Sequence, residues 1–452
     1  MLNVPLLARH ASSSSARAGS SCDIVVVGGG LVGNTIAASI GLNSLLRDKK
    51  VVVVDSAKSK PTLRSNPSTY SNRVSAVSPA SVQLFKDLGV WSRLEKYRVK
   101  RVNKLHVIES SSHAEITFDR PGSAEVAHIV ENDAIVGVLA DVLSTLPNVT
   151  HRIASKVQSC QLPETTSELA SVTLEDGETL SAQLVIGADG ANSMVRESTA
   201  ICTTGWSYSQ SAVVATLRVS ADELNDTAWQ RFSSHGPIAL LPLSSDLSSL
   251  VWTTSPEEAT RLCALNKDAF VDELNEALFT SSHQDQSVNQ ALFTVNSILS
   301  FLRSPIRPSS IPPHILSLET DNRASFPLGL SHSQSYVAPR VALLGDAAHR
   351  IHPLAGQGVN MGWRDVGILT QILEKTHKSG ADIGSVSSLR QYDSVAQRYN
   401  VPTMVAIDWL NRLYSTQSTP IVLARSLGLS TFNSILPLKD LLVHSLSQQP
   451  KL

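Results

Sequence analysis

The sequence predicts an α/β protein in which a parallel-sheet domain is interrupted by a second domain built on an antiparallel sheet and is followed by C-terminal helices. An apolar strand, a glycine-rich turn and a helical segment open the chain as a βαβ unit. Two later apolar strands each run into a Gly and Asp pair, as if returning to the same sheet. Between them, alternating segments separated by Pro and Ser indicate an antiparallel sheet.

The first elements are a strand at residues 23–27, a helix at 31–46 and a strand at 51–54. We expect the same sheet to continue with strands at 184–186 and 341–344.

Alternation predicts antiparallel strands at 212–219 and 238–243, whereas the Pro and Ser content of 304–313 indicates a surface loop. Helical periodicity returns at 389–413. The apolar tail at 421–429 and 435–444 is amphipathic and is predicted to dock on the core, on a partner or on a membrane surface.

These elements predict a division of the chain into four parts. The parts are a leader at 1–21, a nucleotide-binding domain at 22–78, 131–204 and 336–400, a substrate domain at 79–130 and 205–335, and a C-terminal helical region at 401–452.

Composition excludes several classes of protein. With 42% hydrophobic and 17% charged residues, the chain is neither disordered nor a coiled coil. Its net charge of -1 provides no field for nucleic acid. The four cysteines are far apart, which argues against a disulfide framework and a metal site. Every apolar run is too short to span a bilayer.

The leader is basic and contains no acidic residue before Asp23. Arg9 and Arg17 flank a serine tract at 12–15, a pattern typical of a mitochondrial transit peptide. A disordered N-terminus is the alternative.

The first chemical motif is GGGLVG at residues 28–33, which follows a strand and opens a helix. Gly28 allows the tight turn, Gly30 lets the main chain approach a pyrophosphate, and Gly33 allows close helix packing. Asp55 ends the next strand, where an acid binds the adenosine ribose. The motif predicts dinucleotide binding but leaves NAD and FAD open.

Two later motifs decide between the dinucleotides. Residues 187–196 read GADGANSMVR, in which Asp189 is either a cofactor ligand or a helix cap. Residues 345–362 read GDAAHRIHPLAGQGVNMG, with Asp365 following. Asp346 can accept a hydrogen bond from a ribityl hydroxyl, and the glycines expose N–H groups to phosphate and to the flavin edge.

In this order, the three motifs resemble the pyrophosphate, DG and GD signatures of the aromatic-ring hydroxylases, whose type member hydroxylates 4-hydroxybenzoate. The resemblance implies a Rossmann-like FAD-binding domain of the GR2 type. Five further stretches resemble the ubiquinone-biosynthesis branch of that family. They are YSNRVSAVS at 70–78, VEN at 130–132, GWSYSQ at 205–210, FPL at 326–328 and HPLAGQGVNMG at 352–362.

Motifs and resemblance together predict a set of FAD-binding residues and no metal site. The set is Gly28, Gly30, Gly33, Asp55, Arg73, Asn132, Asp189, Asp346, Gly356, Gln357, Gly358 and Asn360. Pro353 is assigned to shaping the ring pocket. His349 and His352 invite an acid/base role, which for His349 competes with a structural hydrogen bond. Arg364 is unexplained.

The resemblance also implies the activity, an FAD-dependent monooxygenase that hydroxylates a polyprenylated 4-hydroxybenzoate-type ring at C5 with O2, through a flavin C4a-hydroperoxide. Implied partners are a ferredoxin with its reductase, or NADPH, and other ubiquinone-biosynthesis proteins. The implied location is the matrix side of the mitochondrial inner membrane, through a peripheral contact. The alternatives are an FAD-dependent prenyl reductase or dehydrogenase, and a non-catalytic quinone-binding subunit.

Overall fold

The computed structural model describes residues 20–425 except 60–61, 64–68, 111–114, 120–124, 166, 221–223, 234–235, 281–310, 417–419 and 422–423. Most of the predicted leader and most of the tail therefore lie outside the described residues, as does 304–310 of the predicted loop. Ser20 and Ser21 pair with Leu180 and Ser181 in the first strand, so the predicted leader overlaps this strand by its last two residues.

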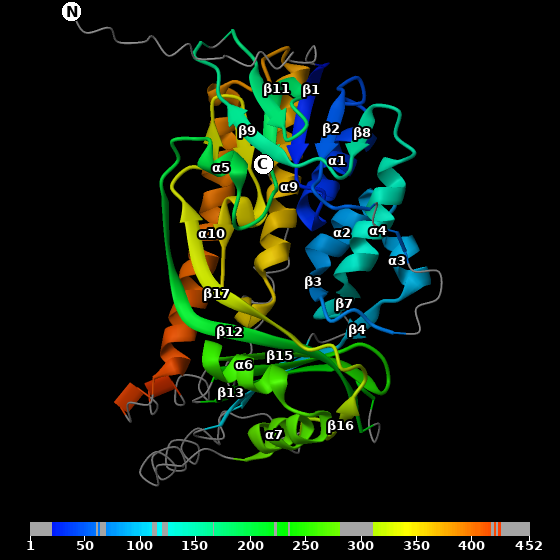
Figure 1. Cartoon of the computed structure of the whole chain (residues 1–452), viewed down its shortest axis with the longest axis vertical. Coiled ribbons are helices and arrows are strands. Elements are labelled where there is room, and N and C mark those ends of the chain that lie inside the picture. The colour runs from blue at the N-terminus through cyan, green and yellow to red at the C-terminus, as the bar shows by residue number, and fades with distance from the viewer. Residues whose placement is uncertain are drawn as a thin grey trace, which may run out of the picture.

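The first large sheet forms the upper half of the molecule (Figure 1). Its strand order is β18-β19-β11-β1-β2-β8, and the core from β19 to β8 is parallel. β9 and β10 extend β11 in antiparallel fashion. The strands are β1 (Ser20–Val27), β2 (Val51–Val54), β8 (Val149–Arg152), β9 (Val157–Gln161), β10 (Ala170–Leu174), β11 (Thr179–Gly187), β18 (Val337–Ala338) and β19 (Val341–Leu343).

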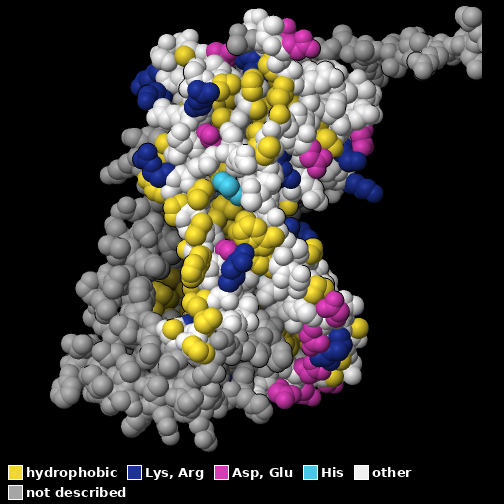
Figure 2. Space-filling model, turned by 90° about the vertical axis from the view of Figure 1, so that its left-hand side faces the viewer, with side chains coloured by type: hydrophobic (Ala, Val, Ile, Leu, Met, Phe, Trp, Pro, Cys, Tyr) yellow, Lys and Arg dark blue, Asp and Glu magenta, His cyan; other side chains and the backbone are white. Residues whose placement is uncertain are grey.

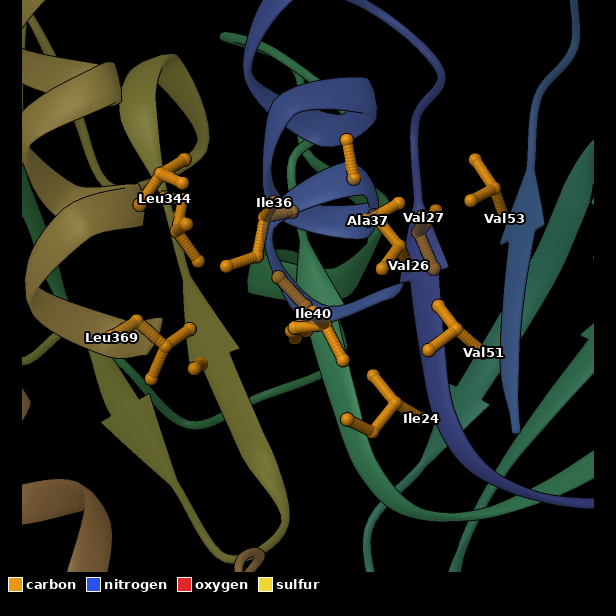
Figure 3. Packing of buried hydrophobic residues seen from close by; sticks show 14 of the residues in the cluster. Ile24, Val26, Val27, Ile36, Ala37, Ile40, Val51, Val53, Leu344 and Leu369 are labelled. Atoms are coloured by element: carbon orange, nitrogen blue, oxygen red, sulfur yellow. The ribbon is translucent and has the colours of Figure 1, made fainter. Parts of the chain in front are cut away.

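Helix α1 packs between α4 and α9 beside this sheet. Figure 3 shows Ile36 and Ile40 of α1 between Val26 on the sheet and Leu369 on α9. Burying such side chains stabilises the fold by roughly 1.5–3 kcal/mol each. The helices around this sheet are α1 (Leu31–Leu42), α2 (Pro79–Asp87), α3 (Trp91–Tyr97), α4 (Asn132–Leu143), α5 (Met194–Glu197), α9 (Gly358–Lys378) and α10 (Val386–Ser415).

The second large sheet forms the lower half, in the order β20-β17-β12-β15-β14-β13-β5-β6 with β16 on β12. All of its pairs are antiparallel except β13 with β5. Its strands are β5 (Lys104–Glu109), β6 (Glu115–Asp119), β12 (Thr203–Val219), β13 (Thr227–Ser233), β14 (Gly236–Pro242), β15 (Leu247–Thr254), β16 (Ile315–Leu318), β17 (Ala324–Ser333) and β20 (His349–Arg350).

The two faces of this second sheet differ in what covers them. Helices α6 (Pro256–Ala264) and α7 (Lys267–Phe279) pack on one face through Leu262, Phe270 and Leu274. The other face meets the segment after β20 and helix α10 in a second apolar cluster. A third, small sheet of β3 (Val74–Val77), β7 (Ala127–Glu131) and β4 (Lys100–Val102) lies beside the two.

Two predicted boundaries differ from the structure. The first helix ends at Leu42 rather than at residue 46, because the chain becomes extended at Asn43, whose side chain accepts a hydrogen bond from the Leu45 N–H group. Helix α10 continues without a break through Pro402, so the proposed division at 400 falls inside one helix.

Candidate functional site

The glycine turn between β1 and α1 leaves space where a phosphate would bind. Gly28 has a φ of +103°, and a methyl group there would lie 2.4 Å from the Ala188 carbonyl oxygen. A methyl group at Gly33 would lie 1.8 Å from the Gly28 carbonyl oxygen. At Gly30, the N-cap of α1, it would meet nothing within 4 Å. Free N–H groups facing open space at a helix N-terminus suit an anion.

Asp55 lies beside this turn, directly after β2. A methyl group on Gly29 would lie 2.4 Å from the Asp55 Oδ2 atom, while Oδ1 accepts a hydrogen bond of 3.0 Å from the Ala57 N–H group. This position at the carboxyl ends of two parallel strands matches that of the ribose-binding acid in dinucleotide folds.

Asp189 caps a helix instead of pointing to open space. Its carboxylate accepts hydrogen bonds from Ser193 Oγ at 2.6 Å and from the N–H groups of Met194 and Val195 at 2.8 and 3.2 Å. Burial raises the pKa of the Asp189 carboxyl, and these hydrogen bonds oppose the rise. The carboxylate therefore caps the helix, the alternative that the sequence left open, and its contact with a cofactor stays a prediction.

The three motifs contact one another although they are far apart in the sequence. The Ala188 N–H group donates to the Val27 carbonyl oxygen at 2.8 Å, and the Leu344 N–H group donates to Gly187 at 2.9 Å. Arg196 Nη1 donates to the Ala347 carbonyl oxygen at 3.0 Å. The first, second and third motifs therefore form one continuous site.

Asp346 has the surroundings of a ligand-binding carboxylate. Its side chain is exposed to solvent, yet the protein around it raises the pKa of its carboxyl, a combination expected in a hollow. Among the described residues, none donates a hydrogen bond to this carboxylate. An open acceptor in a hollow beside the glycine turn fits a ribityl hydroxyl.

A buried network holds the turn that carries Asp346. Asp365 on α9 is fully buried and accepts hydrogen bonds from the Gly345 N–H group at 3.0 Å, from His349 Nε2 at 2.6 Å and from Asn400 Nδ2 at 2.8 Å. These contacts give His349 a structural role, the alternative left open by the sequence.

The loop before α9 is fastened to β3. Asn360 donates to the carbonyl oxygens of Ala76 and Gly356 and accepts from the Ser78 N–H group at 3.0 Å, so its side-chain amide is used within the protein. Gly356 is left-handed, with a φ of +59°. Gln357 and Gly358 form the open N-terminus of α9, where no side chain caps the helix.

Arg73 and Asn132 meet at the other end of β3. The Asn132 N–H group donates to the Arg73 carbonyl oxygen at 3.0 Å, and Asn132 Oδ1 accepts from Ser75 Oγ at 2.6 Å. The Arg73 side chain is exposed. The structure thus leaves the guanidinium available for a ligand, whereas the Asn132 oxygen orders the strand.

His352 and Pro353 form a fixed turn facing the second sheet. The Leu354 N–H group donates to His352 Nδ1 at 3.2 Å, so Nε2 carries the proton and donates to Gln210 Oε1 at 3.2 Å. Burial lowers the pKa of His352 to about 4. Both ring nitrogens are occupied and the ring is neutral at physiological pH, which argues against the acid/base role assigned from the sequence. The sequence motif contained Gln210 but gave no sign of this partnership.

Arg364 is unpaired by any carboxylate among the described residues, and burial lowers its pKa. Its guanidinium lies 5.7 Å from the ring centroid of Tyr399. This contact accounts for part of its surroundings and assigns it no role.

The fold and the site define the class of protein. Residues 21–300 and 304–400 match the FAD binding domain family. The structure is similar to "pqsL, a probable FAD-dependent monooxygenase from Pseudomonas aeruginosa", with a TM-score of 0.67 at 20% identity over 91% of this chain and 99% of that one. It is also similar to p-nitrophenol 4-monooxygenase PnpA from Pseudomonas putida, with a TM-score of 0.68 at 17% identity over 96% and 100%. The chain belongs to the FAD binding domain family, and the predicted fold class and cofactor are confirmed.

Closer relatives identify the family. The chain is 46% identical over 430 residues to "Ubiquinone biosynthesis monooxygenase COQ6, mitochondrial" of Caenorhabditis elegans, covering 94% of this chain and 95% of that one. It is 42% identical over 429 residues to the human protein of that name, covering 92% and 91%. The chain belongs to the ubiquinone biosynthesis monooxygenases.

Proposed function

We propose that this enzyme hydroxylates C5 of the ring of a polyprenylated 4-hydroxybenzoate-type intermediate in ubiquinone biosynthesis. The names of its relatives support the pathway. The observation that supports a polyprenylated substrate is the apolar cluster between the second sheet and the turn at Pro353. It comprises Val107, Ile116, Phe232, Leu330, Ile351, Leu354, Met361, Met404, Ile407 and Tyr414.

The proposed site residues would each bind a different part of FAD. Gly28, Gly30 and Gly33 would hold the pyrophosphate, Asp55 the ribose and Asp346 the ribityl chain. The N–H groups of Gln357 and Gly358 at the start of α9 would face the flavin edge, whereas the Gly356 N–H group donates to the Pro353 carbonyl oxygen and its left-handed conformation would shape the turn. Arg73 would contact the cofactor from the start of β3.

When bound, FAD supplies the redox and oxygen-activating chemistry of the reaction. The protein's own residues orient the ring and exclude water. Gln230 Nε2 donates to the Leu354 carbonyl oxygen at 2.7 Å and so joins the second sheet to the turn at Pro353. The buried side chains around this turn keep water from the reacting atoms, which suppresses wasteful release of peroxide.

The proposal includes the location of the enzyme in the cell, its electron source and its partner proteins. The relatives are named mitochondrial. We place this chain on the matrix side of the inner membrane, in peripheral contact with it, with residues 1–21 as a transit peptide, a ferredoxin and its reductase or NADPH as electron source, and other ubiquinone-biosynthesis proteins as partners.

Product analysis tests the proposal. The purified FAD-loaded enzyme is given reduced ferredoxin or NADPH, a short-tailed 4-hydroxybenzoate derivative and isotopically labelled O2. We expect a hydroxylated product that carries one labelled oxygen atom at C5. A reduced prenyl tail without label would instead indicate a reductase, and the absence of both product and oxygen uptake would indicate a non-catalytic subunit.

A further inference from the structure

Helix α10 presents an unusual outer face near its C-terminal end. From Tyr399 to Leu410, all the exposed side chains of α10 are apolar or aromatic: Tyr399, Pro402, Val405, Ala406, Trp409 and Leu410. We call this set the outer face of α10. Its members recur every three or four residues, so they share one side of the helix. Trp409 is 69% exposed and Val405 52%.

This face continues onto the neighbouring strand. Trp206 of β12 is 40% exposed, and the Arg412 guanidinium lies 5.1 Å from the centroid of its ring. Figure 2 shows hydrophobic side chains running in a band down this side of the molecule, with basic side chains beside them. The band is therefore a feature of the folded surface and extends beyond one helix.

The basic and acidic side chains of α10 lie in different surroundings. Its arginines, Arg390, Arg398 and Arg412, are all exposed. Its acids are engaged inside the protein: Asp393 accepts from the Tyr336 N–H group at 2.7 Å, and Asp408 accepts from Tyr208 Oη at 2.9 Å. Arg412 forms an ion pair with Asp408, with its Nε atom 2.7 Å from Asp408 Oδ2. Arg390 and Arg398 form no ion pair with another described residue, so they supply the positive charge that α10 presents outward, which complements a surface of phosphate groups.

Size and composition favour a lipid surface over another protein. A stable protein interface uses about 20–30 residues a side, whereas the outer face of α10 together with Trp206 comprises seven residues. An apolar stripe with Trp and Tyr, flanked by arginines, is the pattern of a helix lying in the interface of a bilayer. Within the described residues no helix is both long and apolar enough to cross a membrane.

We propose that the outer face of α10, with Trp206, docks the enzyme on an anionic phospholipid bilayer, with the apolar side chains among the acyl chains and Arg390 and Arg398 at the phosphates. This inference rests on the proposed function, because a polyprenyl substrate resides in a bilayer. It deepens that function by naming the surface through which the enzyme reaches its substrate's membrane.

Vesicle sedimentation of the full-length FAD-loaded enzyme tests the proposal. Vesicles of phosphatidylcholine alone are compared with vesicles that also contain phosphatidylglycerol. We expect wild type to bind the anionic vesicles more strongly, and Val405→Glu and Trp409→Glu to lose at least tenfold of that affinity, about 1.4 kcal/mol. The matched control is Leu316→Glu on β16, where Leu316 is 57% exposed at the far edge of the molecule from α10 (Figure 1).

A second variant tests the electrostatic part. Arg390→Gln with Arg398→Gln should remove the preference for anionic vesicles while leaving binding to phosphatidylcholine unchanged. Docking through α10 is excluded if wild type binds neither vesicle, or if Trp409→Glu binds as wild type does. It is also excluded if Trp409→Glu converts a dimer of the wild type into a monomer, because the face would then join two copies of the chain.

Activity on a soluble substrate separates this inference from the proposed function. Trp409→Glu should hydroxylate a short-tailed phenol at the wild-type rate, since the face lies away from the residues assigned to the site. An enzyme that binds vesicles through α10 but forms no hydroxylated product would refute the proposed function and retain the docking surface. The FAD absorbance spectrum and the CD signal of Trp409→Glu are measured first to show that the variant is folded. If Trp409→Glu does not fold, Val405→Glu is used for the same vesicle-binding and activity measurements.

Discussion

At the scale of single residues, adding a methyl group at Gly30 tests the predicted pyrophosphate site. Gly30→Ala adds a methyl group where the protein leaves open space, so the apoprotein should keep its stability, whereas FAD affinity should fall by about tenfold or more, because the pyrophosphate can no longer approach the main chain. Fluorescence titration of the apoprotein with FAD measures the affinity, and thermal unfolding of the apoprotein provides the control. Unchanged affinity in Gly30→Ala would remove the pyrophosphate from this turn.

His352 should make the stability of the protein depend on pH. Its pKa is lowered from 6.5 to about 4 in the fold, so the unfolded chain binds more protons between these values. The contribution of neutral His352 is therefore complete above pH 6.5 and is lost as the pH falls to about 4, amounting to about 3 kcal/mol.

The variant His352→Asn isolates this contribution. The Asn side chain can still accept from the Leu354 N–H group, as a good N-cap does, but it does not titrate. Urea unfolding across this pH range should show the wild type losing about 3 kcal/mol more than His352→Asn. Parallel curves for the two proteins would show that His352 is not the titrating group.

The sequence identified residue types better than residue roles. An Asp four residues before a Ser at a helix start suits both a cap and a ligand, and only the hydrogen bonds from Ser193, Met194 and Val195 assign Asp189 to the cap. The pairing of His352 with Gln210 joins positions 142 residues apart, a separation that no local pattern reveals. Asp346 and Gly30, by contrast, lie in open positions of the kind predicted for cofactor-binding residues, and their FAD contacts stay a prediction.

At the scale of elements, the approach of α9 to α1 depends on Gly362. A methyl group there would lie 2.6 Å from Val32 Cγ2 and 3.2 Å from the Gly345 Cα atom. We expect Gly362→Ala to destabilise the protein by about 1–3 kcal/mol and to weaken FAD binding, because overpacking displaces the turn that carries Asp346. Chemical unfolding and FAD titration measure the two effects.

Gly367 provides the matched control on the same helix. A methyl group at Gly367 would meet nothing within 4 Å, so Gly367→Ala should stabilise α9 by up to about 1 kcal/mol through helix propensity and leave FAD affinity unchanged. Equal losses of stability in both variants would show that close packing at Gly362 is not what matters.

Element types were more predictable than their ends. The βαβ start and the strand before each Gly and Asp pair have strong apolar patterns and appear in the structure as β1, α1, β2, β11 and β19. The end of α1 was placed too late, because Leu45 and Leu46 continue the apolar content of the helix although the chain has already turned at Asn43. Residues 203–210 of β12 have exposed and half-buried side chains, so hydrophobicity revealed only the later part of this strand.

At the scale of the whole molecule, FAD should join the three motifs and raise global stability. A ligand that binds only the folded state at about 100 times its Kd stabilises by about 2.7 kcal/mol. We therefore expect the melting temperature of the apoprotein to rise with FAD concentration, and the rise to be smaller in Gly30→Ala. A melting temperature independent of FAD would contradict a site shared by β1, the DG turn and the GD turn.

The two-sheet architecture was largely predictable because each sheet has its own pattern, near-continuous apolar runs in the parallel one and alternation in the antiparallel one. The division of the chain into domains stays a proposal. The order of strands and the place of β5 and β6 beside β13 depend on pairings between distant segments, which composition does not encode.

The strand order of the first sheet also has a consequence for folding during synthesis on the ribosome. β11 lies between β1 and β19, yet about a hundred and fifty residues separate it from each of them in the sequence. During synthesis, β10 can cover residues 179–182 of β11 early, but residues 185–187 on the same edge stay uncovered until residue 343 has emerged, and pairing over such distances is slow. Residues 188–343, about a third of the 452-residue chain, are therefore synthesised while this part of the apolar strand edge is open. A product truncated before Val341 would keep that open edge permanently and become a substrate for chaperones and proteases.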